Sequence, residues 1–183
     1  MKKLNRKGFT LIELLAVIVI LAIILVVTVP NIINSINDAR VSSIHNLAVS
    51  VANTYDTAFA QDLVATDTNK LLGDIPENIT TTWKCIGDSS LTSTTGSKKA
   101  LSEILGLSDK DVVLSGTAPT ISTTGTETEM KAITTANCSA IRLYNGAAQV
   151  LLVAKDGGKF YVAQNHTYAL STASAGGQNK ISS

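Results

Sequence analysis

A single carboxylate, that of Glu13, lies in the otherwise uncharged and largely apolar run over residues 9–29. A membrane-spanning helix needs about 20 apolar residues, so this run is long enough to cross a bilayer. A charged side chain at the bilayer centre costs about 3 kcal/mol, so an acid kept there needs a specific reason. A buried charge is tolerated when an opposite charge pairs with it in good geometry. The chemistry that these residues predict is therefore ion pairing in an apolar environment.

The segment that precedes the apolar run is basic. Residues 1–8 contain four Lys and Arg side chains and no acid, which favours a cytoplasmic N-terminus with the C-terminal part of the chain outside. A secretory signal peptide fits less well, because its apolar core is about 7–15 residues long and ends at small residues. A basic leader, a glycine, a phenylalanine, a glutamate and an unbroken apolar run together resemble the N-terminus of the type IV pilin superfamily. The matching residues are Gly8, Phe9, Glu13 and Pro30.

This resemblance implies a processing site and an assembly contact. In the family a membrane peptidase cuts after the glycine, here Gly8, and the new N-terminal residue, here Phe9, is N-methylated. The glutamate, here Glu13, would meet the free amine of a neighbouring subunit in the filament. The helix near the proline, here Pro30, would loosen on assembly. The implied partners are identical pilin subunits, the prepilin peptidase and methylase, the pilus assembly machinery and, before assembly, the membrane.

The chain is predicted to form an α+β structure in four segments. Residues 1–8 are the cleaved leader, residues 9–29 a transmembrane and filament-core helix, residues 30–62 an amphipathic continuation of that helix, and residues 63–183 a globular head. We expect the helix to continue past Pro30, although proline removes one backbone hydrogen bond. The resemblance implies a pilin fold, in which the long helix packs on an antiparallel sheet. The spacing predicts one apolar helical face, formed by Ile33, Ile36, Ile44, Leu47, Val51, Tyr55, Ala58 and Phe59.

The clearest strand pattern of the head runs over residues 139–164. Asn145-Gly146 is a strong signal for a two-residue hairpin turn, and Asp156-Gly157-Gly158 marks a second turn. The pattern predicts a three-stranded antiparallel meander, to which residues 130–135 are a candidate fourth strand.

The other parts of the head carry weaker patterns. Residues 64–98 read as a linking region, and the Thr-rich residues 117–128 as a surface loop. Residues 99–105 predict a short helix that Gly106 ends. Residues 171–183 are expected to be a loosely docked tail.

The chain contains two cysteines, Cys85 and Cys138. In an exported domain two cysteines suggest one disulfide, which would stabilise the head by about 4 kcal/mol through loop closure. Two buried free thiols are the alternative. We expect no zinc site, because the two cysteines with His45 and His166 lack the spacing of zinc ligands.

No catalytic constellation is found, so we expect neither an enzyme nor a cofactor. The sequence has no nucleophile elbow, metal motif or phosphate-binding loop. Ser108, Asp109 and Asp111 favour a capped turn over a cation site, because the glycine and the distal glutamate of a calcium loop are missing. Removal of the four leader charges from 15 Lys and Arg leaves 11 against 14 acids, a net charge of −3. That charge argues against nucleic acid as a partner.

These observations predict the structural subunit of a type IV pilus, used for adhesion, motility or biofilm formation. It would be a single-pass protein of the cytoplasmic membrane before assembly and part of an extracellular filament afterwards. The closest alternative is a pseudopilin of a type II secretion or DNA-uptake system, which shares the N-terminus. An alternative of another class is a membrane-anchored binding ectodomain that never polymerises, and it predicts an uncleaved leader and no dependence on Glu13.

Overall fold

The computed structural model describes residues 10–123, 125–134, 136–156 and 159–171. The chain divides into two compact units, residues 1–39 and residues 40–183, which are described separately below. The helix α1 (Leu11–Asp62) contributes to both units, and Pro30 lies inside it. The prediction that the helix continues past Pro30 is therefore confirmed.

In the first unit, α1 leaves its apolar side chains uncovered. None of the residues in its most apolar stretch is buried. Among the described residues, α1 is the one helix that is long and apolar enough to cross a membrane. A continuous apolar surface of this kind is rare on a soluble monomer, so it is a surface for lipid or for other protein.

In the second unit, α1 is amphipathic and buries one face in the head. Its buried residues recur every three or four positions, as expected for one face of a helix; they are Val41, Ile44, Ala48, Val51, Ala52, Tyr55, Ala58 and Asp62. The predicted face was wrong at four positions. Leu47 and Phe59 in this unit are 38% and 37% exposed, and Ile33 and Ile36 in the first unit are 49% and 45% exposed. Ala48 and Ala52 are buried instead, and both belong to the first hydrophobic core of the head. A search for large apolar residues overlooks such positions.

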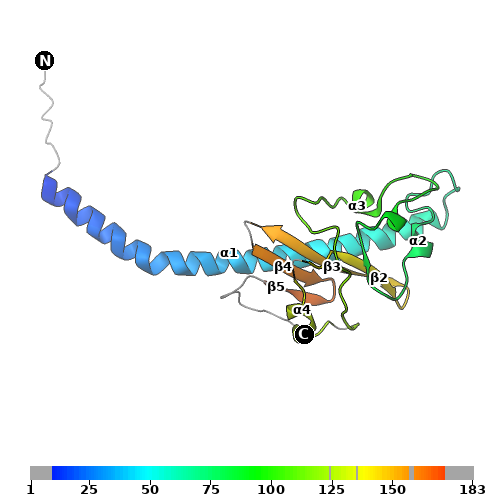
Figure 1. The fold of residues 1–183 in the computed structure, drawn as a ribbon. Coiled ribbons are helices and arrows are strands. Elements are labelled where there is room, and N and C mark those ends of the chain that lie inside the picture. The colour runs from blue at the N-terminus through cyan, green and yellow to red at the C-terminus, as the bar shows by residue number, and fades with distance from the viewer. Residues whose placement is uncertain (1–9, 124, 135, 157–158, 172–183) are drawn as a thin grey trace, which may run out of the picture. The chain divides into compact units, whose positions relative to one another are not determined.

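The head is built on a five-stranded sheet in which every neighbouring pair is antiparallel (Figure 1). The strands pair in sequence order and form a meander. The predicted three-stranded meander is confirmed as the three central strands, and two further strands extend it at its edges. The strands are β1 (Lys84–Cys85), β2 (Ala140–Tyr144), β3 (Ala147–Asp156), β4 (Lys159–Gln164) and β5 (Thr167–Ser171).

The turn between β2 and β3 sets the register of the hairpin. Asn145 and Gly146 have φ angles of 52° and 81°, the left-handed conformation that a two-residue hairpin turn of the mirror-image type requires. Tyr144 then lies opposite Ala147, and Ile141 opposite Val150. The predicted hairpin turn is therefore confirmed. The second predicted turn falls partly on residues 157–158, which lie outside the described residues, as does most of the predicted tail over 171–183.

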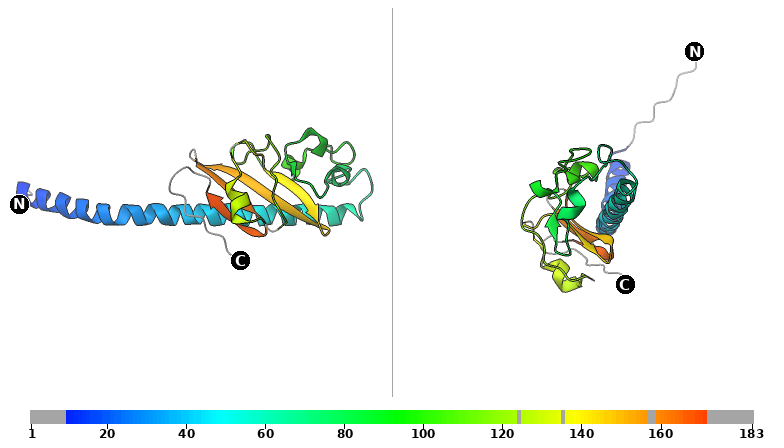
Figure 2. Two further views of the ribbon diagram at one scale, coloured as in Figure 1. Left: turned by 60° about the horizontal axis from the view of Figure 1, so that its bottom comes forward. Right: turned by 90° about the vertical axis from the view of Figure 1, so that its right-hand side faces the viewer.

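Successive side chains of a strand point to opposite faces, so the sheet separates two hydrophobic cores. Val150 and Leu152 of β3 join the buried face of α1 in the first core. Leu151 and Val153 join the second core, which is completed by other parts of the head, among them Trp83, Ile121, Met130, Ile133 and Cys138. Figure 2 shows the second half of α1 running along the sheet. The sheet is thus covered on both faces.

Short helices lie in the segments between α1 and β2, before and after β1. The predicted helix over residues 99–105 is confirmed as α3, and Gly106 with a φ angle of 68° follows it. The linking region over residues 64–98 is not featureless, because it contains α2, β1 and η1. These helices are α2 (Ile75–Asn78), η1 (Ser89–Leu91) and α3 (Leu101–Ile104).

The predicted fourth strand over residues 130–135 is wrong, because this segment begins inside a helix, α4 (Glu127–Lys131). Thr126 and Glu129 form a reciprocal capping box that fixes the start of α4. Met130 is 0% exposed in the second core. The Thr-rich segment 117–128 is also more than a surface loop, because Ile121 within it is 4% exposed.

Candidate assembly surface

The residues that the sequence singles out lie in separate regions of the chain. Gly8 and Phe9, the predicted processing site, lie outside the described residues. Glu13 lies in the first turn of α1, and Pro30 lies further along the same helix. Cys85 and Cys138 lie in the head, where the structure joins them in a disulfide across 53 positions of sequence.

Glu13 forms a capping box with Thr10 at the start of α1. The first backbone N–H groups of a helix have no partner within it, and a side-chain oxygen commonly accepts from them. Here the backbone N–H and the hydroxyl of Thr10 donate to Glu13 Oε2 over 2.8 and 2.7 Å. In return the backbone N–H of Glu13 donates to Thr10 Oγ1 over 3.4 Å. The carboxylate is therefore held close to the helix start.

This arrangement leaves the Glu13 carboxylate able to bind a further donor. Both Thr10 groups bond to Oε2, whereas an ionised carboxylate accepts about four hydrogen bonds over its two oxygens. The site is also exposed. An ammonium group could thus approach Glu13 without first breaking the capping box.

The apolar half of α1 satisfies its polar groups within the helix. The hydroxyl of Thr28 donates to the backbone oxygen of Ile24 over 2.9 Å, so this side chain adds no unpaired donor to the apolar surface. Ser35 bonds the oxygen of Asn31 in the same way over 3.0 Å. Pro30 has no N–H, so the helix lacks one internal hydrogen bond at that turn. The helix thus presents apolar side chains on its whole circumference, with one local weak point.

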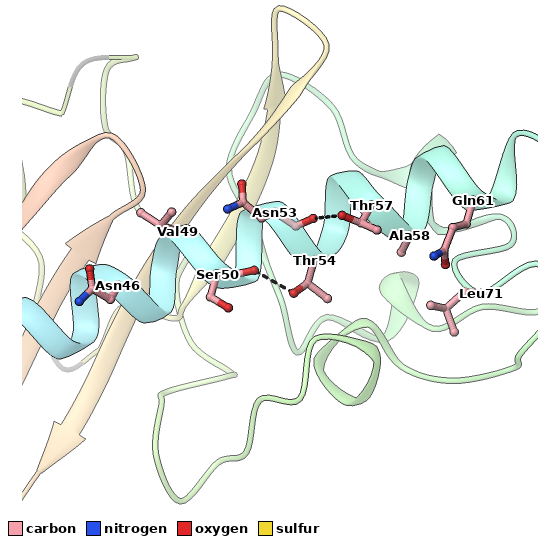
Figure 3. Close-up of a pocket in the computed structure, with 9 residues that line it drawn as sticks. All are labelled: Asn46, Val49, Ser50, Asn53, Thr54, Thr57, Ala58, Gln61 and Leu71. Carbon is pink, nitrogen blue, oxygen red and sulfur yellow. Dashed lines mark hydrogen bonds between the residues drawn. The ribbon is translucent and has the colours of Figure 1, made fainter.

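A groove of about 500 Å³ follows α1 within the head; we name it the α1 groove (Figure 3). Its walls consist mainly of small polar side chains. The hydroxyls of Thr54 and Thr57 donate to the backbone oxygens of Ser50 and Asn53 over 2.8 and 2.7 Å, so they are already satisfied. The groove offers a surface of modest polarity on which another protein surface could pack. It is lined by Asn46, Val49, Ser50, Asn53, Thr54, Thr57, Ala58, Gln61 and Leu71.

A cluster around Arg142 holds the segment before α4 against the sheet. The guanidinium donates to Gln149 Oε1 over 2.7 Å and to the backbone oxygens of Ile121 and Ser122 over 2.9 and 2.8 Å. It lies 4.3 Å from the ring centre of Trp83, a distance at which a cation–π contact is favourable. Burial of this cation lowers the pKa of Arg142. The sequence analysis did not single out Arg142, because its partners lie far away in sequence.

Two carboxylates that the sequence analysis did not single out fix the loop after α1. Asp62, at the last residue of α1, accepts from the backbone N–H groups of Leu71, Leu72 and Gly73 over 2.6, 2.7 and 3.0 Å. Asp74 accepts from the hydroxyl and the backbone N–H of Thr94 over 2.6 and 2.7 Å. These bonds lower the pKa of Asp74 well below its usual range. For Asp74, the preceding Gly73 is the available sequence signal, but it does not reveal the partner.

The two histidines and the predicted turn occupy unremarkable places. His45 is partly buried on α1, and His166 is exposed beside Asn165. The hydroxyl of Ser108 accepts from the backbone N–H of Lys110 over 3.3 Å, as in the predicted capped turn. Among the described residues, no group of three or more His, Cys, Asp or Glu side chains is placed to hold a metal ion.

Comparison with known proteins adds one finding, at the N-terminus. Residues 3–29 match the prokaryotic N-terminal methylation motif. This match contains Gly8, Phe9 and Glu13 and ends before the head. No curated protein and no solved structure matches the chain. The methylation motif is the signature of type IV pilins and prepilins, and together with the exposed apolar helix it supports a membrane-anchored precursor of the pilin-like or pseudopilin kind.

Proposed function

We propose that this chain is the structural subunit of a type IV pilus. It is cut between Gly8 and Phe9, methylated at Phe9 and polymerised through α1 into a surface filament for adhesion, motility or biofilm formation. The membrane holds the precursor until assembly, and the filament carries the mature subunit outside the cell. The partners in this process are identical subunits, the prepilin peptidase and methylase, and the assembly machinery.

The observation that carries this proposal is the apolar half of α1, with its one acid. The side chains around this half of the helix are exposed, and none of the residues in its most apolar stretch is buried. A bilayer can cover such a helix, and so can a bundle of identical helices. Only the bundle gives Glu13 a partner, because each processed neighbour contributes a new amine at Phe9. The methylation motif at residues 3–29 supports the same processing.

The pairing of Glu13 with an amine would act mainly as a register device. A buried ion pair adds little net stability, because the desolvation of both charges offsets their attraction. An unpaired Glu13 in the apolar filament core would nevertheless be costly, so subunits should stop sliding where the charges meet. A contact between different surfaces of identical subunits does not close on itself, and it therefore generates an open filament. In the head, the α1 groove is a surface that such a contact could use.

The proposal is tested by blocking the processing step. Gly8→Ala should leave the precursor uncut and in the membrane, and sheared extracellular material should contain no subunit. The measurement is immunoblotting of membrane and sheared fractions, with electron microscopy of the sheared fraction. Normal cleavage and normal filaments in Gly8→Ala cells would contradict the proposal. Processed wild-type chain that is found in the envelope but never in sheared filaments would favour a pseudopilin.

A further inference from the structure

Two large aliphatic side chains, those of Leu63 and Val64, are exposed directly after the end of α1; we name them the apolar knob. They are 72% and 89% exposed, more than any other large apolar side chain described in the unit over residues 40–183. Their backbone N–H groups donate to the oxygens of Phe59 and Gln61, each over 3.2 Å, and so anchor the knob to the last turns of α1. A single exposed aliphatic residue is common on a protein surface, whereas two adjacent ones at a fixed place form a small apolar patch.

The α1 groove has the chemistry to receive such a patch. None of its lining residues is charged, and Val49, Ala58 and Leu71 give it apolar walls. Its volume of about 500 Å³ lies in the range of small-molecule sites, so it can admit two aliphatic side chains. A charged occupant would lose its water in the groove and gain no opposite charge there, whereas an aliphatic occupant has no charge to leave without a partner.

The α1 groove and the apolar knob follow each other along the chain. Gln61 is the last residue of α1 that lines the groove, and Figure 3 shows it with Leu71 at one end of the groove. The backbone oxygen of Gln61 accepts from the N–H of Val64, so the knob begins where the groove ends. Neither Leu63 nor Val64 lines the groove of its own chain. A knob and a groove that do not meet within one chain can meet between two copies.

We infer that the apolar knob of one subunit packs into the α1 groove of a second copy of this chain. The inference rests on the proposed function, because polymerisation through the first half of α1 holds identical heads together at a high effective concentration, at which a small contact suffices. The groove and the knob are different surfaces, so the subunit that offers its knob keeps its groove for a third subunit, and the other keeps its knob. The contact therefore extends an open filament and does not close into a dimer.

The test is disulfide cross-linking in filaments sheared from cells. Val64→Cys is combined in one chain with Asn46→Cys, Ser50→Cys or Thr54→Cys, which place a thiol on successive turns of the α1 groove. A disulfide requires Cα atoms within about 7 Å of each other. The helix rises about 12 Å from Thr54 to Asp62, so the two new thiols of one chain cannot bond to each other. At least one of these pairs should give a ladder of dimers, trimers and longer multimers on a non-reducing gel.

Subunits that carry one new thiol distinguish a contact between different surfaces from a symmetric one. Val64→Cys alone should give no multimers, because a knob would meet a groove and not a second knob. Cells that express Val64→Cys and the cross-linking groove variant on separate chains should give dimers and nothing longer. The matched control pairs Val64→Cys with Thr120→Cys and should give no multimers, because Thr120 is exposed next to Ile121 of the second core, outside the groove.

Val64→Asp tests whether the contact contributes to assembly. A carboxylate that is buried without a partner is costly, so Val64→Asp should lower the amount of subunit in sheared filaments by about tenfold or more. The variant should still be cut after Gly8 and keep the wild-type melting temperature, because Val64 is exposed in the single subunit. Thr120→Asp adds the same charge at another exposed position and should leave the amount of sheared subunit unchanged.

Four outcomes would overturn the inference. Abundant filaments in which none of the three groove pairs gives multimers would show that the knob does not enter the groove, and dimers from Val64→Cys alone would show that two knobs meet. A groove thiol that cross-links only to a protein of different mass would assign the groove to another partner. A normal filament yield from Val64→Asp would show that the knob stays in solvent. In each case wild-type filaments still form, so the proposed function stands; sheared wild-type material without the subunit would instead defeat the proposed function, and this inference with it.

Discussion

Glu13 is held by Thr10 in the single chain and is available to a second donor. The capping box orients the carboxylate at the start of α1, and Oε2 receives both Thr10 groups. Any neighbouring amine would therefore meet a carboxylate whose position is already restricted. Pre-organisation of this kind lowers the entropy that is lost when a contact forms.

The first residue-scale prediction concerns this carboxylate. Glu13→Ala should abolish or strongly reduce sheared filaments, because the register contact is lost, while membrane insertion should be unchanged, because the helix becomes more apolar. Immunoblots of membrane and sheared fractions measure both effects. The control is Glu77→Ala, which removes an exposed acid from the head. Abundant, regular filaments from Glu13→Ala cells would refute the pairing of Glu13 with an amine.

Glu129 carries a second residue-scale prediction, on pH. It accepts from the hydroxyl of Ser122 over 2.7 Å and from the backbone N–H of Thr126 over 2.9 Å, and these bonds help to lower its pKa to about 2. A carboxyl whose pKa is lower in the folded state stabilises the fold above its unfolded pKa of about 4.3. That contribution is lost as the pH falls from there towards 2.

The measurement is the melting temperature of the full chain in non-ionic detergent between pH 7 and pH 2, followed by the fluorescence of Trp83, the one tryptophan. Glu129→Gln should lower the melting temperature at pH 7 and flatten its decline below pH 4.5. Glu77→Gln makes the same change of charge without those bonds and should keep the wild-type slope. An unchanged slope in Glu129→Gln would show that Glu129 does not contribute to acid stability.

At the scale of elements, the disulfide joins an edge of the sheet to the segment that covers its outer face. Cys85 lies in β1, the short first strand, and Cys138 is buried in the second core. With β1 only two residues long, its pairing with β2 contributes few backbone bonds. The cross-link therefore holds an edge that the hydrogen bonds of the sheet hold weakly.

The prediction for the disulfide is that removal of either cysteine lowers the stability of the head by the same amount. Cys85→Ala and Cys138→Ala should each lower the free energy of unfolding by about 4 kcal/mol, as expected for a closed loop of this length. The double variant should lose little more than either single one. Denaturant titration of the full chain in detergent, read by Trp83 fluorescence, measures the three values, and reduction of the wild type is the control. Clearly unequal losses would mean that each side chain acts by its own packing.

The sequence revealed the elements with strong periodic signals and not those that depend on distant partners. The long α1, the turn at Asn145-Gly146 and the three central strands follow from local patterns of spacing and turn chemistry. Sequence spacing does not mark the strand β1, because two residues carry no alternation. Residues 130–135 have the apolar content of a strand, but the capping box at Thr126 starts a helix before them.

The candidate site divides in the same way. Glu13 and the two cysteines could be named from residue type and spacing, and Pro30 from the resemblance to type IV pilins. Asp62 and Arg142 could not, because their roles depend on partners distant in sequence that the fold brings near, such as Trp83 for Arg142. The sequence shows where charged side chains occur, but only the tertiary structure shows which groups they bind.

At the scale of the whole molecule, the chain combines an uncovered apolar helix with a head that has its own two cores. The two compact units meet in sequence between Ala39 and Arg40. The head has its own apolar cores and its disulfide, so the proposed exchange of lipid for neighbouring subunits would involve the first half of α1. A precursor that changes its surroundings in this way needs no rearrangement of the head.

The measurement that tests this account most directly is intact and N-terminal mass analysis of filaments sheared from cells. The account predicts a chain that begins at N-methylated Phe9 and is two hydrogens lighter than its reduced form, because Cys85 and Cys138 are bonded. Sheared material without this chain, together with membranes that retain residues 1–8 on it, would contradict the account and favour an anchored ectodomain.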